Sequence, residues 1–470
     1  MSTQNEKPQD ELDNIPQNED QAYASLPDET IEAITDALEE EQHEIVDQHI
    51  ADMSNADFSD LLEKITPDER QQILEKYSDN IDADVYSEMD EDVRKSILEA
   101  MPPKQVAEIL DDLDSDDAVD LTENLDEDFR TDVTEHLSAK TKAALEEGLS
   151  FPEDSAGRMM QREFVAIPQF WTVGQTIDYL RDSSNDLPED FSDIFIVSPT
   201  HHIVGEIPLS RCIRSKRSTK LEDLTLDSVH PIPAALDQED AAHIFRRENI
   251  TSAPVVDEDK RLIGVITVDD IVDVIDEEAE EDILKLGGVE QSDIYSAVWT
   301  TSLLRFKWLF VNLLTAILAS AVISLFDATI EELVALAVLM PIVASMGGNA
   351  GTQALTIAIR AIATKELSKT NAWRIVGKET MVGTINGSAF AIIAGILAAL
   401  WFQNIMLGGV IAAAMMINLI VAGLCGAGIP IALNRMGSDP AVSSTVVLTT
   451  VTDVIGFFAF LGLAAIFLMP

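Results

Sequence analysis

The sequence predicts a multidomain membrane protein. A helical repeat, an α/β region and a connecting helix come first, and an all-α domain of five transmembrane helices follows. Three observations predict this order. Only seven of the 83 acidic residues lie after residue 300, so the excess negative charge is confined to the first part of the chain. An apolar repeat of twelve residues begins near residue 61, and five long apolar stretches occupy residues 303–470.

Residues 1–45 are polar and acidic, with several Gln and Pro residues. Such a composition favours a partly disordered tail, although one helix is expected near Asp28–Glu44. The N-terminus shows no apolar signal segment. We therefore expect the acidic part of the chain to remain on the cytoplasmic side, where it is made.

Residues 46–150 carry the twelve-residue repeat. Apolar residues four positions apart recur, as in Leu61–Ile65 and Ile73–Tyr77, and this spacing forms one stripe on a helix. Most of the pairs are followed by a residue that caps helices well, such as Thr66, Asp90 or Ser138. The pattern predicts short helices that stack into an α-helical superhelix.

Residues 151–275 contain a second repeat, offset by 59 residues. The segments 194–209 and 253–268 each read as a strand, a polar turn and a strand. They resemble a tandem pair of cystathionine-β-synthase-type (CBS) domains, here 151–214 and 215–275. The resemblance implies a sensing module rather than a catalyst, of a kind that often binds adenine nucleotides. The second copy has Asp269 and Asp270 after its second strand, where the first has Ser210 and Arg211.

Residues 276–302 connect this region to the apolar part and begin in the densest acidic patch of the chain. Seven acidic residues fall within residues 273–282. If the segment is helical, Glu278, Glu281 and Asp282 share one face, where like charges repel. Two interpretations stay open: a solvated linker, or a helix held in place by divalent ions.

The five apolar stretches are 308–326, 333–359, 380–402, 404–433 and 441–468. Each is long enough to cross a bilayer. The loop from residue 360 to 379 holds five basic residues against two acidic ones, so the positive-inside rule places it in the cytoplasm. We therefore expect a multi-pass protein of the cell (inner) membrane, with its N-terminus inside and its C-terminus outside.

Asp453 is the only ionisable residue within these five stretches. A carboxylate at membrane depth is costly unless it meets water, a partner or an ion. Thr449 and Thr450 lie one helical turn before it, which predicts a stripe of hydroxyls and a carboxylate. A cation pathway is the simplest physical resolution.

The second apolar stretch contains a run of small and polar residues after Pro341. Gly347, Gly348, Asn349 and Gln353 are the candidates to line a cavity. A broken helix at membrane depth is tolerated where it lines such a cavity, so we expect a break here. The alternative is a face of small residues for close helix packing.

Residues 341–353 and the segment from Asp439 to Gly456 together resemble the signatures of the MgtE family of magnesium channels, whose domain order matches the order here. The resemblance implies a homodimer with one pore between the subunits. The second and fifth spans would line that pore, with Asp453 as its metal-binding carboxylate. It also implies regulatory Mg²⁺ sites on Asp116, Asp120, Asp270, Asp273, Glu278, Glu281 and Asp282.

The expected function is passive, Mg²⁺-selective uptake that high cytosolic Mg²⁺ closes. A broader transporter of Co²⁺ or Mn²⁺ and a membrane-tethered Mg²⁺ sensor without flux remain alternatives. No phosphate-binding loop or other catalytic motif is present, so we do not expect an enzyme. A net charge of -52 makes nucleic acid a poor partner.

Overall fold

The computed structural model describes residues 26–40, 42–51, 53–77, 81–182, 187–188, 191–226, 228–289, 298–368 and 370–469. The chain divides into two compact units, residues 1–275 and 276–470, and each is described by itself. The predictions for residues 1–25 and for the segment 290–297 fall outside the described residues.

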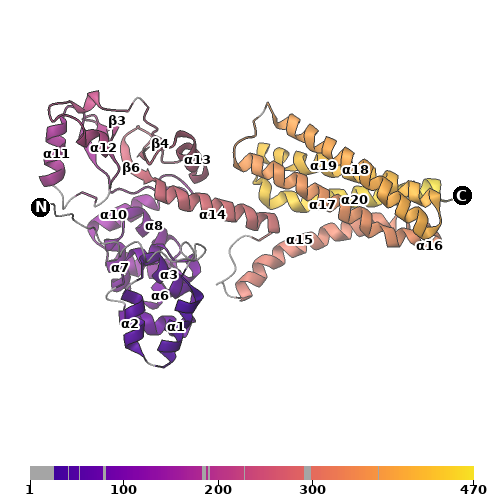
Figure 1. Ribbon diagram of the computed structural model, residues 1–470, viewed down its shortest axis with the longest axis horizontal. Helices are drawn as coiled ribbons and strands as arrows, with labels where there is room; N and C mark the ends of the chain where they lie inside the picture. The colour runs from indigo at the N-terminus through magenta and orange to yellow at the C-terminus, as the bar shows by residue number, and fades with distance from the viewer. Residues whose placement is uncertain are drawn as a thin grey trace, which may run out of the picture. The chain divides into compact units, whose positions relative to one another are not determined.

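The first unit opens with short helices in succession (Figure 1). They are α1 (Asp28–Glu39), α2 (His43–Ala51), α3 (Asn55–Lys64), α4 (Pro67–Tyr77), α5 (Asp84–Ser87), α6 (Glu91–Ala100), α7 (Pro103–Asp112), α8 (Ser115–Glu123), α9 (Glu127–Thr134) and α10 (Ala139–Gly148). Leu61 and Ile73 of the predicted stripes are fully buried in one apolar cluster. Ile34 of α1 lies in the same cluster, so the shared core includes helices before the repeat.

The expected caps explain where several of these helices begin. The Asp90 carboxylate accepts hydrogen bonds from the backbone N–H groups of Asp92 and Val93. Ser138 accepts one from the N–H of Thr141. Each bond satisfies a backbone donor that the first helical turn leaves free. The twelve-residue period therefore sets the length of the helices through their caps.

The α/β region consists of two three-stranded sheets of the same topology. Its elements are β1 (Ala166–Pro168), α11 (Val173–Asp182), β2 (Asp193–Val197), β3 (Ile203–Pro208), α12 (Leu209–Ile213), η3 (Leu221–Asp223), β4 (Ile232–Pro233), α13 (Gln238–Glu248), β5 (Ser252–Val256) and β6 (Leu262–Thr267). Val197 pairs with Ile203, and Val256 pairs with Leu262, each next to a shift in register. The offset of 59 residues is thus confirmed down to single strand pairs.

Helix α14 (Val268–Gly287) begins where β6 ends and carries the acidic patch. Its helical conformation is confirmed. The connecting segment therefore starts as the continuation of the last helix of the α/β region, and its acidic side chains have the fixed spacing of a helix.

The second unit contains α15 (Val298–Ser324), α16 (Asp327–Glu332), α17 (Ala335–Ala363), α18 (Ala372–Phe402), α19 (Ile405–Arg435) and α20 (Pro440–Phe467). Five of these, all except α16, are long and apolar enough to cross a membrane. Helix α19 packs against α17, α18 and α20 (Figure 1). Half of its apolar window is buried, against 6% for α15. The fourth span is thus the centre of the bundle.

The predicted break in the second span is wrong. Helix α17 runs without interruption through Pro341 and the glycine pair. The small residues instead allow close packing: a Cβ at Gly347 would clash with the Asn418 side chain, and one at Gly351 would lie 3.0 Å from Leu448 Cδ1. The alternative, a face for helix packing, is the one that the structure supports at these two glycines.

The prediction that Asp453 is the only ionisable residue in the spans also needs correction. Helix α18 begins at Ala372, eight residues before the expected start, so it includes Arg374, Lys378 and Glu379. The Glu379 side chain is 5% exposed. Arg374 and Lys378 made this first part of the helix look like a cytoplasmic loop in the sequence.

Candidate functional site

Asp453 lies on α20 and is half-buried. Within the described chain, no hydrogen bond or ion pair joins its carboxylate to another residue. Thr449 donates its hydroxyl to the Thr445 carbonyl at 3.0 Å, and Thr450 donates to Val446 at 2.6 Å. Because those protons are used within the helix, the hydroxyl oxygens remain as acceptors beside the carboxylate. The predicted stripe therefore offers oxygen ligands only.

Helix α17 carries a row of polar side chains that are exposed in a single chain: Ser345, Asn349, Thr352, Gln353 and Thr356. Their spacing puts most of them on one face of the helix. Polar residues facing lipid are costly, so this face requires water or another protein surface. The same helix packs directly against α20, where Gly351 meets Leu448.

The two candidate glycines of α17 differ. Gly347 is buried against Asn418 and faces the bundle rather than an open path. Gly348 has no atom of a neighbouring residue within 4 Å of where its Cβ would stand. Of the pair, only Gly348 lies toward open space.

In the first unit, Asp116 and Asp117 of α8 lie beside Asp270 at the start of α14. Asp116 is half-buried, and its buried Oδ1 atom has no hydrogen-bond partner among the described residues. Burial, followed by the charge on Asp270, raises the pKa of Asp117 to about 7. Burial also raises the pKa of Asp270 to about 6, although the Thr267 hydroxyl donates to its Oδ2 at 2.6 Å. These carboxylates favour a proton or a cation between them.

Two other predicted ligands of this unit lie close enough for their charges to act on that group, Asp120 on Asp117 and Asp273 on Asp270, but each also has a neighbour outside it. Asp120 forms an ion pair of 2.7 Å with Arg94, whose side chain is buried. Asp273 lies near Glu88, whose pKa is raised by its burial and then by the charge on Asp273. The predicted ligands of this unit therefore form one acidic region in which Asp120 has a basic partner in Arg94.

The last turns of α14 have a different arrangement. The Lys285 ammonium forms ion pairs with Glu281 and with Asp439, the latter at 2.9 Å. Burial disfavours the charged form of Lys285, but hydrogen bonds to both carboxylates outweigh it and raise its pKa. Burial and the charge on Asp439 raise the pKa of Asp282. Glu278, one turn earlier, is half-buried.

This end of α14 also contacts the membrane helices. Leu286 packs against an apolar cluster that includes Leu355 of α17 and Leu448 of α20. Asp439, the partner of Lys285, caps α20 by accepting a hydrogen bond from the N–H of Ala441 at 2.8 Å. The end of α14 is therefore attached to both helices of the candidate pathway.

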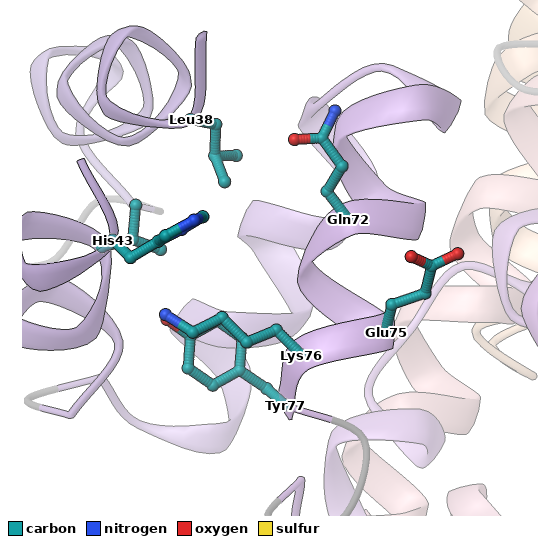
Figure 2. A pocket seen from close by; sticks show the side chains of 7 residues that line it. Leu38, His43, Gln72, Glu75, Lys76 and Tyr77 are labelled. Atoms are coloured by element: carbon teal, nitrogen blue, oxygen red, sulfur yellow. The ribbon is translucent and has the colours of Figure 1, made fainter. Parts of the chain in front are cut away.

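Among the residues that the structure describes, no three His, Cys, Asp or Glu side chains form a group that could hold a metal ion. A pocket of about 240 Å³ lies in the helical repeat, lined by Leu38, His43, Val46, Gln72, Glu75, Lys76 and Tyr77. Figure 2 shows His43 on one side of it and Gln72 with Glu75 on the other. It contains none of the predicted site residues.

Sequence reasoning missed Asp117, Lys285 and Asn418 and assigned no role to Asp439. Asn418 had a readable signal, because it is a single amide within an apolar run of the fourth span. Lys285 had a partial signal, because Glu281 lies four positions before it on the same helix, but its second partner, Asp439, lies far away in the sequence.

Comparisons with known proteins agree with the domain order. The family model MgtE, described as a divalent cation transporter, matches residues 340–463. The MgtE intracellular N domain matches residues 53–154, and the CBS domain matches residues 221–277. A magnesium transporter MgtE of Thermus thermophilus is 32% identical over 335 residues, which cover 70% of this chain and 73% of the relative. The chain belongs to the MgtE family.

A second relative, the magnesium transporter MgtE of Bacillus subtilis, is 30% identical over 68% of this chain and 71% of its own length. A solved structure of the cytosolic domain of the Mg²⁺ channel MgtE with ATP covers 52% of this chain and 99% of its own. Its identity is 26% and its TM-score is 0.48. Family membership makes the chain a membrane transporter with intracellular N-terminal and CBS domains.

Proposed function

We propose that this protein is a Mg²⁺ channel that mediates passive uptake and is closed by cytosolic Mg²⁺. The observation that carries the proposal is Asp453, a half-buried carboxylate in an apolar helix with no partner among the described residues. The two relatives of this chain described above are both named as magnesium transporters. The oxygen ligands around it, from hydroxyls and a carboxylate, are those that hard divalent cations prefer.

The pore would form between two copies of the chain. In one chain the polar face of α17 is exposed, and only 6% of the apolar window of α15 is buried. A second copy related by a two-fold axis would enclose that polar face and bring two Asp453 carboxylates to one path. Two negative charges at one position favour a divalent over a monovalent cation.

Mg²⁺ loses its water slowly and is held by few protein groups. Pore-lining candidates Gly348, Asn349, Gln353, Thr449 and Thr450 would therefore contact a largely hydrated ion through water. A cage made only of protein ligands would bind the ion too tightly for conduction. This argues for transport through outer-shell contacts, with Asp453 as the main charge.

Closure would use the acidic groups of the first unit and of α14. Two like charges about 4 Å apart repel by roughly 4 kcal/mol at an effective dielectric constant of about 20. Mg²⁺ bound at Asp116 and Asp270, and in the neighbourhoods of Asp120, Asp273, Glu278, Glu281 and Asp282, would remove this repulsion. Because the end of α14 contacts α17 and α20, its position can control the pathway.

Two further assignments belong to this proposal. The C-terminus would be extracytoplasmic, since five spans follow a cytoplasmic N-terminal part. The CBS pair would bind an adenine nucleotide as a second regulatory ligand. The second CBS copy, with its Thr267–Asp270 motif at the start of α14, is the better candidate half of that site.

Substitution of Asp453 tests the proposal. Asp453→Ala and Asp453→Asn should both abolish Mg²⁺ flux into proteoliposomes while the protein still forms dimers, because both remove the charge. Asp327→Ala, at an exposed acid of α16, is the matched control and should keep its flux. Normal Mg²⁺ flux in either Asp453 variant would refute the role of this residue.

The family description also favours a broader selectivity for divalent cations. Flux assays with Co²⁺ and Mn²⁺ in place of Mg²⁺ separate the two possibilities. A channel specific for Mg²⁺ should conduct neither ion at a comparable rate. A membrane-tethered sensor would conduct none of the three.

A further inference from the structure

Asn418 lies in the middle of α19, and its side chain is completely buried among membrane helices. Its Nδ2 donates a hydrogen bond of 2.9 Å to the Val343 carbonyl of α17. Its Oδ1 has no partner among the described residues. A buried amide oxygen without a hydrogen bond is costly, and a leucine of similar size would avoid that cost. Its presence here therefore calls for a reason other than stability.

Two glycines on different helices make room for the Asn418 side chain. A Cβ at Gly347 of α17 would clash with Nδ2, and a Cβ at Gly456 of α20 would lie 2.7 Å from the same atom. Even alanine at either position would force the amide or a helix to move. Asn418 thus occupies a notch that is formed jointly by α17 and α20.

The contacts of Asn418 fall on the turns that carry the candidate pathway. In an α-helix the Val343 carbonyl is also the acceptor for the N–H of Gly347. Asn418 therefore bonds to the turn that leads into Gly348 and Asn349. On α20, Gly456 lies three residues after Asp453 and so on a neighbouring part of the same surface.

We infer that Asn418 is a positioning residue for ion conduction. It sets the distance and rotation of α17 relative to α20, so that Asp453 and the polar face of α17 keep a fixed geometry toward the ion. It does not contact the ion, since it is buried within one chain. The inference rests on the proposed function.

Coupled substitutions test this role in the purified full-length protein. Gly456→Ala should lower Mg²⁺ flux in proteoliposomes about tenfold, equivalent to about 1.4 kcal/mol. Asn418→Ala removes the atoms with which the new methyl group clashes. The double variant Asn418→Ala/Gly456→Ala should therefore conduct several times faster than Gly456→Ala alone. Gly409→Ala adds a methyl group to α19 where no neighbour lies within 4 Å, and should leave flux unchanged.

A second variant guards against a failure of Gly456→Ala to fold. Asn418→Leu keeps the size of the side chain but loses the bond to Val343, so it should give folded protein with reduced flux and an altered ratio of Mg²⁺ to Co²⁺ flux. Wild-type flux and ratio in Asn418→Leu, or a double variant no faster than Gly456→Ala, would overturn the role of Asn418. Absence of Mg²⁺ flux in the wild-type protein would instead contradict the proposed function itself.

Discussion

The two ends of α14 carry acidic groups in opposite electrostatic settings. At its start, Asp270 lies with Asp116 and Asp117. Burial raises the pKa values of all three, and the charge on Asp270 raises those of Asp116 and Asp117 further. At its end, Glu281 and Asp439 share the ammonium of Lys285. One end lacks a neutralising side chain in that group, whereas the other has a lysine attached to the same helix.

This difference indicates which end of α14 depends more on a cation from solution. Among the described residues, no lysine or arginine forms an ion pair with Asp116, Asp117 or Asp270, so protons or ions from solution are the means to relieve their repulsion. At the end of α14, Lys285 already relieves part of it. We therefore expect Mg²⁺ sensitivity to depend more strongly on the first group than on the second.

The largest effect is expected from Asp116→Asn combined with Asp117→Asn. Neutral side chains no longer repel Asp270, so the two elements should stay together without Mg²⁺. The Mg²⁺ concentration for half-closure should therefore fall by about tenfold or more, which corresponds to a typical coupling free energy. The measurement is Mg²⁺ flux against cytosolic Mg²⁺ in proteoliposomes. An unchanged Mg²⁺ concentration for half-closure would contradict a role for the carboxylates at the start of α14.

A smaller shift is expected from Glu281→Gln and from Asp282→Asn. Each removes one carboxylate that would bind Mg²⁺, at an end where Lys285 already relieves the repulsion, so closure by Mg²⁺ should weaken by about fivefold. Exposed Glu280→Gln on the same helix is the matched control. If both variants retain unaltered Mg²⁺ inhibition, the end of α14 has no regulatory metal site.

Lys285→Ala tests whether the lysine replaces a free ion. Its loss leaves Glu281 and Asp439 without their shared cation, so the channel should be more open at low Mg²⁺ and close normally at high Mg²⁺. The ratio of flux at low to high Mg²⁺ should rise roughly threefold, as expected for a partly exposed ion pair. Lys285→Arg keeps the charge and should behave as wild type. A ratio in Lys285→Ala equal to that of the wild type would show that Lys285 does not replace a free cation at this end of α14.

The smallest effect concerns Glu206 of β3, a buried carboxylate near Asp193. Burial, followed by the charge on Asp193, raises the pKa of Glu206 to about 7 from 4.5. The folded state therefore binds more protons than the unfolded state between these values, so stability falls as pH rises through them. The first thermal transition of the full-length protein should move down by about 2–4 °C between about pH 5 and pH 8.

Glu206→Gln should flatten this pH dependence, since the amide does not titrate. Asp193 accepts hydrogen bonds from Thr251 and Ser252, which remain in the variant. Equal slopes in the variant and the wild type would show that Glu206 does not behave like the carboxylates at the start of α14.

Local patterns in the sequence predicted most of the architecture. The caps and apolar pairs of the repeat act within a few residues, and they marked helices such as α6 and α10 correctly. The five spans followed from apolar length alone. The order of strand, turn and strand in each half of the α/β region followed from its repeat.

The rest depended on contacts between distant residues. Arg94 forms an ion pair with Asp120, a predicted metal ligand that lies 26 positions away. Lys285 of α14 forms an ion pair with Asp439, which caps α20. The glycines of α17 were interpreted as a break in the helix. Their packing partner, Asn418, lies 75 residues after the carbonyl group that it contacts, so the sequence did not show that the glycines make room for its side chain. No pattern in a single sequence reports such pairings.

Whether this protein is a Mg²⁺ channel closed by cytosolic Mg²⁺ is decided by Mg²⁺ flux through the purified wild-type protein in proteoliposomes, with Mg²⁺ titrated on the cytosolic face. The account predicts flux at low cytosolic Mg²⁺ that falls as Mg²⁺ rises. Absence of flux at every concentration, or flux that does not respond to cytosolic Mg²⁺, would contradict it.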